Sequence, residues 1–172
     1  MNIRLSERSL ETKFGMFREV LYYDGQKESI ALVMGDVDGR ADVLCRVHSH
    51  CIGAHVFNSV ECTCREEMDA AQAQIEREGR GVVIWLDQEG KGNGHLALME
   101  SIPYKKQLGQ AEAYVKAGFS ADARSYRSAA DILKDLKIQS IVLLSDSSEK
   151  ADDLRQVGIT VSGVRALLAE GG

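Results

Sequence analysis

The sequence predicts an α/β fold, a single mixed-sheet domain with a β-rich antiparallel N-terminal part and an alternating helix/strand C-terminal part. Short apolar runs separated by turn residues fill the region before residue 60. Continuous apolar runs of strand length, typical of strands buried on both faces, follow at 81–86 and 140–145. Helical patterns separate these later runs, and strand–helix–strand alternation implies parallel pairing.

The N-terminal part contains three segments that read as strands, at 13–23, 29–34 and 42–47. The segment from Gly35 to Gly39 between the last two has turn chemistry. Because successive strands joined by short turns pair antiparallel, we expect an antiparallel sheet here.

The C-terminal part begins with a helix over 65–78, which has Met68, Ala71 and Ile75 on one face and Gly79 as its stop. Farther along, Ser128 is a candidate helix cap, and Ile132, Leu133 and Leu136 are expected to point inward. The elements expected from there on are a helix to about 137, a strand at 140–145, a helix from 147 or 148 to 157, and a strand at 159–164.

Composition indicates one globular domain, expected to span residues 1–172. The chain is 44% hydrophobic and 27% charged, with a net charge of −5. An overall negative charge gives no bulk attraction for nucleic acid, so no nucleic-acid partner is expected. No apolar run approaches membrane-spanning length, and the first ten residues lack a signal-peptide core. We therefore expect a cytoplasmic protein with no membrane partner.

Three of the four cysteines form a cluster, with ten residues between Cys51 and the pair Cys62 and Cys64. Without an export signal, clustered cysteines favour a metal site over disulfides, and thiolates suit zinc. Three protein ligands plus water make a catalytic zinc site, whereas four make a structural one. Spacing alone leaves open both the fourth ligand and the alternative of buried, inert thiols. Candidates for a fourth ligand are Cys45, His48, His50 and His55, of which Cys45 lies in an apolar strand and reads as core.

Other candidates for chemistry lie in loops that follow predicted strands. The glycine-rich loop 87–95 has the composition to turn backbone N–H groups toward a phosphate, with Lys91 adding charge, but an ordinary flexible turn fits equally well. Asp122 and Arg124 read either as a solvated loop pair or as catalytic groups. Ser145, at the end of a buried strand, reads either as a ligand-facing residue or as a helix cap.

Taken in order, these segments resemble the GTP cyclohydrolase II family, enzymes that open the guanine ring in riboflavin biosynthesis. The similarity is collinear from about Thr12 to Val161. The segments that carry it are Ala31 to Asp36, Val43 to Ser49, the Cys51/Cys62/Cys64 spacing, Gln88 to Gly90, Gly118 and Phe119 with Asp122 and Arg124, and Leu143 to Ser145 with Lys150.

The resemblance implies a mechanism and a set of site residues. In that family three cysteines hold Zn²⁺, a zinc-bound water attacks C8 of guanine, formate leaves, and pyrophosphate is released. It places the general base on Asp122, the arginine proposed to take the nucleotidyl group on Arg124, and the tyrosine near guanine on Tyr104. It also implies Mg²⁺ with the triphosphate and a homodimer. The implied substrate contacts are Arg46, Val47, His48, Ser49, His50, Glu67, Glu89, Gly90, Lys91, Gln110, Ser145 and Lys150.

The sequence departs from the family's pattern mainly in charge. The replacements are Glu61, Asp87 and Lys91 for arginine, His50 for glutamate, Glu67 for glutamine, and Asp146 and Ser147 for an asparagine pair. Two unit charges 4 Å apart interact by about 4 kcal/mol near a protein surface, so carboxylates beside a triphosphate would weaken its binding strongly. Three hypotheses follow: a hydrolase acting on GTP, a divergent homologue acting on a less phosphorylated purine or another nucleobase, and a non-catalytic zinc-stabilised binding protein.

Overall fold

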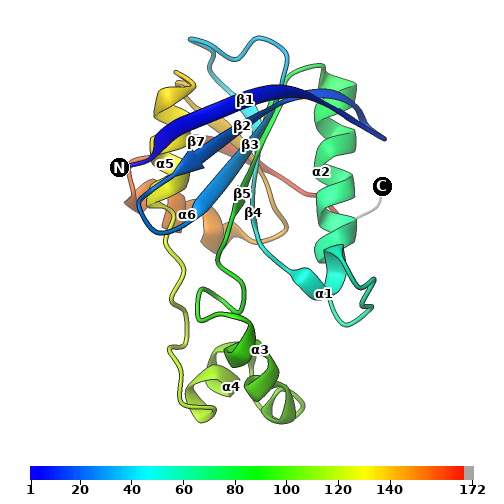
Figure 1. The fold of residues 1–172 in the computed structure, drawn as a ribbon, viewed down its shortest axis with the longest axis vertical. Coiled ribbons are helices and arrows are strands. Elements are labelled where there is room, and N and C mark those ends of the chain that lie inside the picture. The colour runs from blue at the N-terminus through cyan, green and yellow to red at the C-terminus, as the bar shows by residue number, and fades with distance from the viewer. Residues whose placement is uncertain (169–172) are drawn as a thin grey trace.

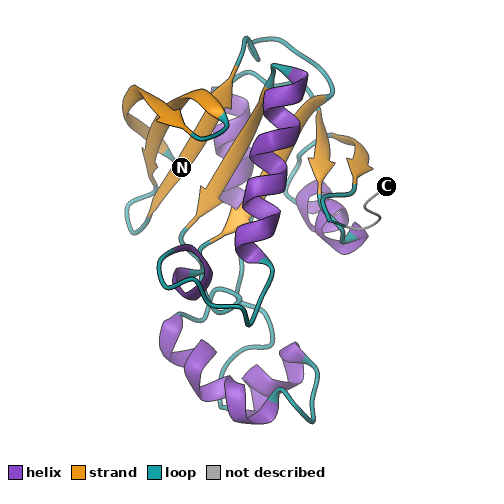
Figure 2. Ribbon diagram, turned by 90° about the vertical axis from the view of Figure 1, so that its right-hand side faces the viewer, coloured by secondary structure: helices purple, strands orange, loops and turns teal. Residues whose placement is uncertain are grey.

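The computed structural model describes residues 1–168 and has one seven-stranded mixed sheet with helices on both faces (Figures 1 and 2). The strands are β1 (Ile3–Thr12), β2 (Gly15–Tyr23), β3 (Glu28–Met34), β4 (Val43–Ser49), β5 (Gly81–Leu86), β6 (Ile141–Leu144) and β7 (Val161–Arg165). Their order across the sheet is β1-β2-β3-β5-β4-β6-β7. This arrangement confirms the predicted α/β class.

The two halves of the sheet differ in strand direction, as the sequence predicts, but β4 belongs to the other half. Strands β1, β2, β3 and β5 pair antiparallel, whereas β4 pairs parallel with both β5 and β6. The expectation that β4 joins the antiparallel part is therefore wrong. The reason is that the connection from β4 to β5 runs through a long helix, which allows a parallel crossover, and β5 inserts between β3 and β4.

The helices divide between the two faces of the sheet and the end beyond the carboxyl ends of β4 and β5 (Figure 1). Leu44 and Val83 pack with the helix at 64–78, while Cys45 and Val47 pack in the opposite layer with the helices at 127–135 and 148–156. This alternation follows from the two-residue period of a strand. The helices are α1 (Ile52–His55), α2 (Cys64–Glu78), α3 (His95–Ser101), the 3₁₀ helix η1 (Ile102–Tyr104), α4 (Gln110–Lys116), α5 (Arg127–Asp135) and α6 (Ser148–Gln156).

Several elements are absent from the sequence-based expectation. Strand β1 was not predicted because almost all of its side chains are exposed. Without a buried face, its sequence shows no alternation of apolar and polar residues. Helices α1, α3 and α4 are short and lie at the end of the sheet rather than on a face of it (Figure 1). The expected Ser128 cap is wrong, since α5 begins at Arg127 with Tyr126 at the N-cap position. Gly79 ends α2 in the left-handed conformation, as predicted.

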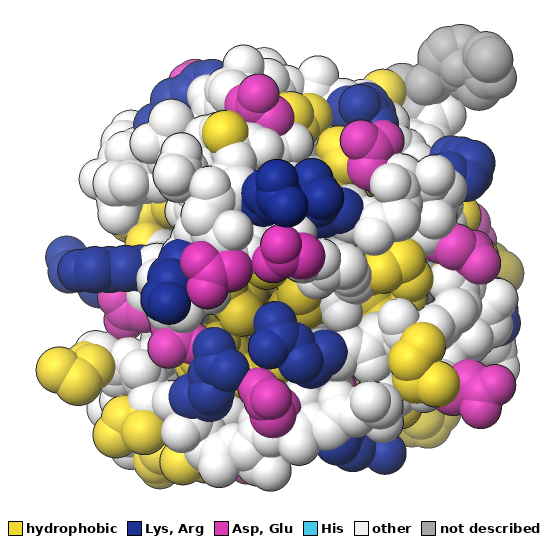
Figure 3. All heavy atoms as spheres, turned by 90° about the horizontal axis from the view of Figure 1, so that it is seen from above, with side chains coloured by type: hydrophobic (Ala, Val, Ile, Leu, Met, Phe, Trp, Pro, Cys, Tyr) yellow, Lys and Arg dark blue, Asp and Glu magenta, His cyan; other side chains and the backbone are white. Residues whose placement is uncertain are grey.

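The surface and the helix lengths bear on possible partners. Within residues 1–168, no helix has the length and apolar character needed to span a bilayer. On the face seen from above in the orientation of Figure 1, basic and acidic side chains are interspersed (Figure 3). That face therefore offers no patch of a single sign. The predicted domain ends at residue 172, and residues 169–172 of it lie outside the described residues.

Candidate functional site

Three cysteine sulfurs meet where β4 gives way to helices. Cys51 lies two residues after the end of β4 and immediately before α1. Cys62 lies in the loop between α1 and α2, and Cys64 is the first residue of α2. All three Sγ atoms lie within 4.8 Å of one another, and Cys51 Sγ is 3.7 Å from Cys62 Sγ. Two thiolates each about 2.3 Å from one tetrahedral zinc lie about 3.8 Å apart. The sulfur arrangement therefore fits a single zinc ion.

The fourth position of this cluster has no protein ligand among residues 1–168. No histidine, carboxylate or further cysteine in that range joins the three sulfurs as a candidate metal ligand. Cys45 is fully buried in the core, as the sequence predicts, and His48 and His55 bond to each other through their Nε2 atoms at 2.9 Å. The donor set is thus that of a catalytic site, with room for an exogenous ligand.

The three cysteines line a cavity of about 630 Å³. On one side it is bounded by the ends of β4 and β5 with α1, and on the other by residues of α3, η1 and α4. Beside the cysteines, the predicted site residues that line it are Ser49, His50, Glu89, Gly90, Lys91, Gln110 and Arg124. The predicted site residues that do not line it are Arg46, Val47, His48, Glu67, Tyr104, Asp122, Ser145 and Lys150.

Asp122 and Arg124 form a close ion pair at the edge of this cavity. Arg124 donates from Nε to Asp122 Oδ1 at 3.0 Å and from a terminal nitrogen to Oδ2 at 2.6 Å. Partial burial raises the pKa of Asp122, but the hydrogen bonds from Arg124 outweigh it and leave this pKa below its ordinary value. Asp122 is therefore ionised at neutral pH and able to accept a proton.

The glycine-rich loop is fastened to the loop that carries this ion pair. Ala123 N donates to Lys91 O at 2.8 Å, and Asn93 Nδ2 donates to Ser120 O at 3.0 Å. Gly92 has φ +84°, and a Cβ atom there would lie 2.5 Å from the carbonyl carbon and oxygen of Ala123. Only glycine permits this approach, so the backbones of the two loops are packed directly against each other.

Replacing Gly92 by alanine is expected to lower the free energy of unfolding by about 1–3 kcal/mol, because the new Cβ meets backbone atoms and the left-handed conformation is strained. Chemical denaturation measures this change. Gly163→Ala is the matched control, since an added Cβ there has nothing within 4 Å and the residue lies in β7. Equal stability of the two variants would contradict the proposed close packing of the loops.

Glu89 ties the glycine-rich loop to the metal-ligand segment. Its Oε1 atom accepts a hydrogen bond from Ile52 N, next to Cys51, at 3.2 Å and interacts with His95 Nδ1 at 3.0 Å. The neighbouring Gln88 donates to Ser49 Oγ at 3.2 Å and accepts from Ser125 N at 3.0 Å. Both side chains are buried, so these bonds hold the cavity wall in one arrangement.

Several predicted substrate contacts form a polar layer beneath the cavity instead of lining it. Arg46 is buried and donates to Leu144 O at 3.1 Å, to Glu67 Oε2 at 3.2 Å and to His48 Nδ1 at 3.3 Å. Burial lowers the pKa of His48 to about 2, so its ring is neutral. Since Nδ1 accepts from Arg46, the ring proton sits on Nε2 and is donated to His55.

Lys150 belongs to the same layer. Its half-buried side chain turns inward, and Nζ donates to the carbonyl oxygen of Val47 at 3.0 Å. Loss of hydration, followed by the nearby positive charges of Arg46 and Arg124, lowers the pKa of Lys150 to about 7. The side chain of Val47 lies in the core, and its carbonyl oxygen is bonded to Lys150, so the structure does not bring Val47 to the cavity. Ser145 Oγ accepts from Ser147 N at 3.0 Å, two residues on; since Ser147 is the N-cap residue of α6, Ser145 does not cap this helix.

Replacing Lys150 by methionine is expected to flatten the pH dependence of stability. Between about pH 7 and 10 the unfolded chain holds a proton on Lys150 that the folded chain lacks, so wild-type stability rises with pH relative to the variant. One proton gives at most about 1.4 kcal/mol per pH unit. Denaturation curves at about pH 6 and 9 measure the change. The exposed Lys134→Met on α5 is the control and should show no such difference.

The charge departures seen in the sequence divide between the cavity and its surroundings: His50, Glu61 and Lys91 line it, and the others do not. His50 Nδ1 lies 3.5 Å from Asp87 Oδ1, so two departures face each other as a pair. Asp87 lines a different cavity, and Glu67 is engaged by Arg46. Neither of these two carboxylates lines the cavity that contains the cysteines. Of the acidic replacements, Glu61 does line the cavity.

The tyrosine expected near the guanine is also placed differently from the prediction. Tyr104 does not line the cavity, whereas Tyr114 of α4 does. Tyr114 is fully buried, and its hydroxyl has no hydrogen-bond partner among residues 1–168. Lys105 and Lys106 line the cavity as well. The sequence carried no signal for these three positions beyond their residue types.

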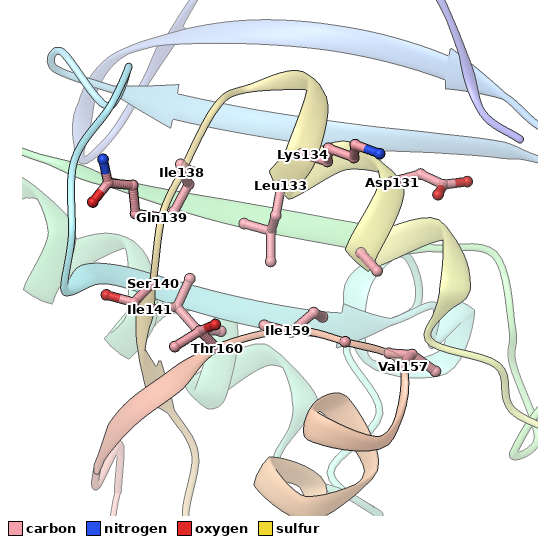
Figure 4. Close-up of a pocket in the computed structure, with 12 residues that line it drawn as sticks. Asp131, Leu133, Lys134, Ile138, Gln139, Ser140, Ile141, Val157, Ile159 and Thr160 are labelled. Carbon is pink, nitrogen blue, oxygen red and sulfur yellow. The ribbon is translucent and has the colours of Figure 1, made fainter.

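A second cavity, of about 350 Å³, lies between α5 and the segment that connects α6 to β7 (Figure 4). Aliphatic side chains such as Leu133, Ile138 and Ile159 line it, with Asp131 and Lys134 of α5. It contains none of the predicted site residues and no cysteine or histidine. The chemistry-bearing groups are therefore concentrated in the cavity with the cysteines.

Comparison with known proteins places the chain in a family. The GTP cyclohydrolase II family model matches residues 3–166. The riboflavin biosynthesis protein RibBA of Bacillus cytotoxicus is 43% identical over 152 residues, 87% of this chain and 38% of that protein, and RibBA of Bacillus mycoides is 42% identical over 159 residues, 91% of this chain and 40% of that protein. The chain thus spans about two fifths of the length of the curated relatives it matches.

A solved structure supports the fold. The crystal structure of RibBX from A. baumannii, described as a two-domain 3,4-dihydroxy-2-butanone 4-phosphate synthase, aligns with a TM-score of 0.53 at 20% identity. The alignment covers 96% of this chain and 40% of that one, and at this identity it speaks for the fold alone. The match to the family model over nearly the whole chain, together with these relatives, shows that the chain belongs to the GTP cyclohydrolase II family.

Proposed function

We propose that this chain is a zinc-dependent hydrolase that opens the imidazole ring of a guanine nucleotide and releases formate, together with pyrophosphate when the substrate is GTP. The observation that carries the proposal is the open three-cysteine cluster in the same cavity as Arg124, which holds Asp122. Family membership supports a role in riboflavin biosynthesis, Mg²⁺ as a further cofactor, a homodimer and a cytoplasmic location.

The residues of the chain divide the work of this reaction. Cys51, Cys62 and Cys64 hold the zinc, which when bound supplies a Lewis acid and a nucleophile at neutral pH. Asp122 is ionised and accepts a proton during attack on the ring. Arg124, fixed by Asp122, presents its guanidinium to the nucleotide.

The geometry weakens the case for a less phosphorylated substrate. That hypothesis depends on carboxylates facing the ligand, yet of the three acidic replacements only Glu61 lines the cavity, whereas Asp87 and Glu67 do not. The hypothesis of a closed, non-catalytic zinc site lacks a fourth protein ligand among residues 1–168. GTP hydrolysis is therefore the best-supported of the three.

The test is to incubate the zinc-loaded protein with GTP, GMP and guanosine and to measure formate and pyrophosphate. Formate and pyrophosphate from GTP, lost on chelation and restored by zinc, support the proposal. Formate from GMP or guanosine but not from GTP would favour the divergent homologue. Stoichiometric zinc with no formate from any of them would leave the zinc-stabilised binding protein as the explanation.

A further inference from the structure

We infer that Lys105 and Lys106 bind the phosphate chain of the nucleotide; this inference rests on the proposed function and names the groups that recognise its substrate. Neither residue belongs to the contacts that the sequence resemblance implies. Both lie in the connection between η1 and α4, and both line the cavity that contains the three cysteines.

The first step is the balance of charge inside this cavity. Its charged lining consists of Lys91, Lys105, Lys106, Arg124, Glu61 and Glu89. Glu89 is occupied by Ile52 N and His95, and Arg124 by Asp122. Within residues 1–168, none of the three lysines has a carboxylate within ion-pair distance. The cavity therefore carries an excess of uncompensated positive charge, which favours an anionic ligand.

The second step is the position of the two lysines. Lys105 follows directly on η1, and its backbone N–H donates to Ile102 O at 3.2 Å, which fixes the chain at that point. Its ammonium lies 5.9 Å from the centroid of the Tyr114 ring, and Tyr114 is fully buried. A cation over an aromatic face keeps its full charge, so the contact orients the ammonium without neutralising it.

The third step is what the segment faces. Residues of α3, η1 and α4 close the cavity on the side away from the sheet, while the cysteines come from the side of β4, α1 and α2. A nucleotide whose base lies at the cysteines would extend its phosphates within the same cavity. Lysine binds phosphate as a compact point charge, and two adjacent lysines suit a phosphate chain more than a single phosphate.

The segment also accounts for the departures from the family's charge pattern. Position 61 has a glutamate where the family usually has an arginine, and this residue lines the cavity. Lys105 and Lys106 supply two positive charges to the same cavity from a different element. The positive charge needed for a phosphate chain is thus supplied from the connection between η1 and α4.

The experiment compares Lys105→Gln/Lys106→Gln with the wild type, both zinc-loaded, on GTP, GMP and guanosine. For GTP, kcat/KM is expected to fall about 10- to 100-fold, mainly through KM, since hydrogen bonds to charged groups contribute this much. For guanosine it is expected to change less than about threefold. Lys116→Gln is the matched control, because Lys116 is an exposed residue of α4 outside this cavity. Equal losses on GTP and guanosine would overturn the inference.

Titration with inorganic pyrophosphate, followed by calorimetry on zinc-loaded wild type and variants, separates this inference from the proposed function. Weaker pyrophosphate binding in the double variant, unchanged in Lys116→Gln, supports the lysine site even if no nucleotide is turned over and the proposed function fails. Equal pyrophosphate affinity in wild type and double variant would refute the lysine site even if GTP is hydrolysed. Folding of each variant is checked by its zinc content and its thermal transition.

Discussion

Cys62→Ser is expected to lose the proposed zinc ion and, with it, turnover of the nucleotide. A serine hydroxyl stays protonated at neutral pH and is a poor ligand for zinc, and two thiolates alone leave the ion with too few protein ligands. Changing residues that only support zinc ligands already costs about 10- to 100-fold in affinity, so removing a direct ligand is expected to cost more than about 100-fold. Metal analysis of the purified variant and competition with a chelator measure this loss.

Cys45→Ala is the control for this variant. Cys45 is fully buried in β4 and packs in the core layer with α5 and α6, away from the cluster. Its replacement is expected to lower stability by about 1–2 kcal/mol through lost packing while one zinc per chain remains. One zinc per chain in Cys62→Ser, bound as tightly as in the wild type, would contradict the three-cysteine site.

The parts of the fold that the sequence predicted are those in which a buried face repeats at a fixed period. Helix α2 was placed to within a residue because Ala71 and Ile75 recur on one buried side and Gly79 stops it. Strands β5 and β6 were found because they are apolar throughout. In contrast, β1 has no buried face, and nothing short of pairing with β2 makes it a strand.

The cysteine cluster was predictable and the cavity around it was not. Cys51, Cys62 and Cys64 are close in sequence, and their chemistry restricts what they do. Tyr114 and Lys105 reach the same cavity only because α3, η1 and α4 fold back beneath the ends of β4 and β5, and such placement depends on long-range packing. Local residue types do not encode it.

The placement of the replaced charges was likewise not predictable from sequence. Asp87 precedes the cavity residue Gln88, and Glu67 lies three residues after Cys64 in α2, yet neither side chain lines the cavity. Asp87 Oδ1 lies 3.5 Å from His50 Nδ1, and Glu67 forms an ion pair with the buried Arg46. The sequence therefore predicted that these residues lie near the site, but not the direction in which their side chains point.

Asp122→Asn is expected to lower kcat by about 10²- to 10⁴-fold while zinc content stays at one per chain, because a general acid or base contributes that much. Asparagine has nearly the same shape and still accepts a hydrogen bond from Arg124, so the loop geometry is retained while the basic carboxylate is lost. Rates of formate release at saturating GTP, with metal analysis of the same samples, measure both quantities. Asp152→Asn is the control, since Asp152 forms an exposed pair with Arg155 on α6.

The pH profile adds a second readout for the same carboxylate. Arg124 keeps the pKa of Asp122 below its ordinary value, so the wild-type rate should stay on its plateau as pH falls through the usual aspartate range and drop only below it. Arg124→Gln removes the guanidinium, and with it the side-chain hydrogen bonds and the positive charge that lower this pKa. The backbone N–H of residue 124 still donates to Asp122 and partial burial continues to raise the pKa, so the acid limb should move to higher pH. An unshifted limb in Arg124→Gln, or more than half of the wild-type rate in Asp122→Asn, would assign proton transfer to a different group. A shifted acid limb in Arg124→Gln, together with a low kcat in Asp122→Asn, would identify Asp122 as the proton acceptor and Arg124 as the residue that positions it beside the proposed metal site.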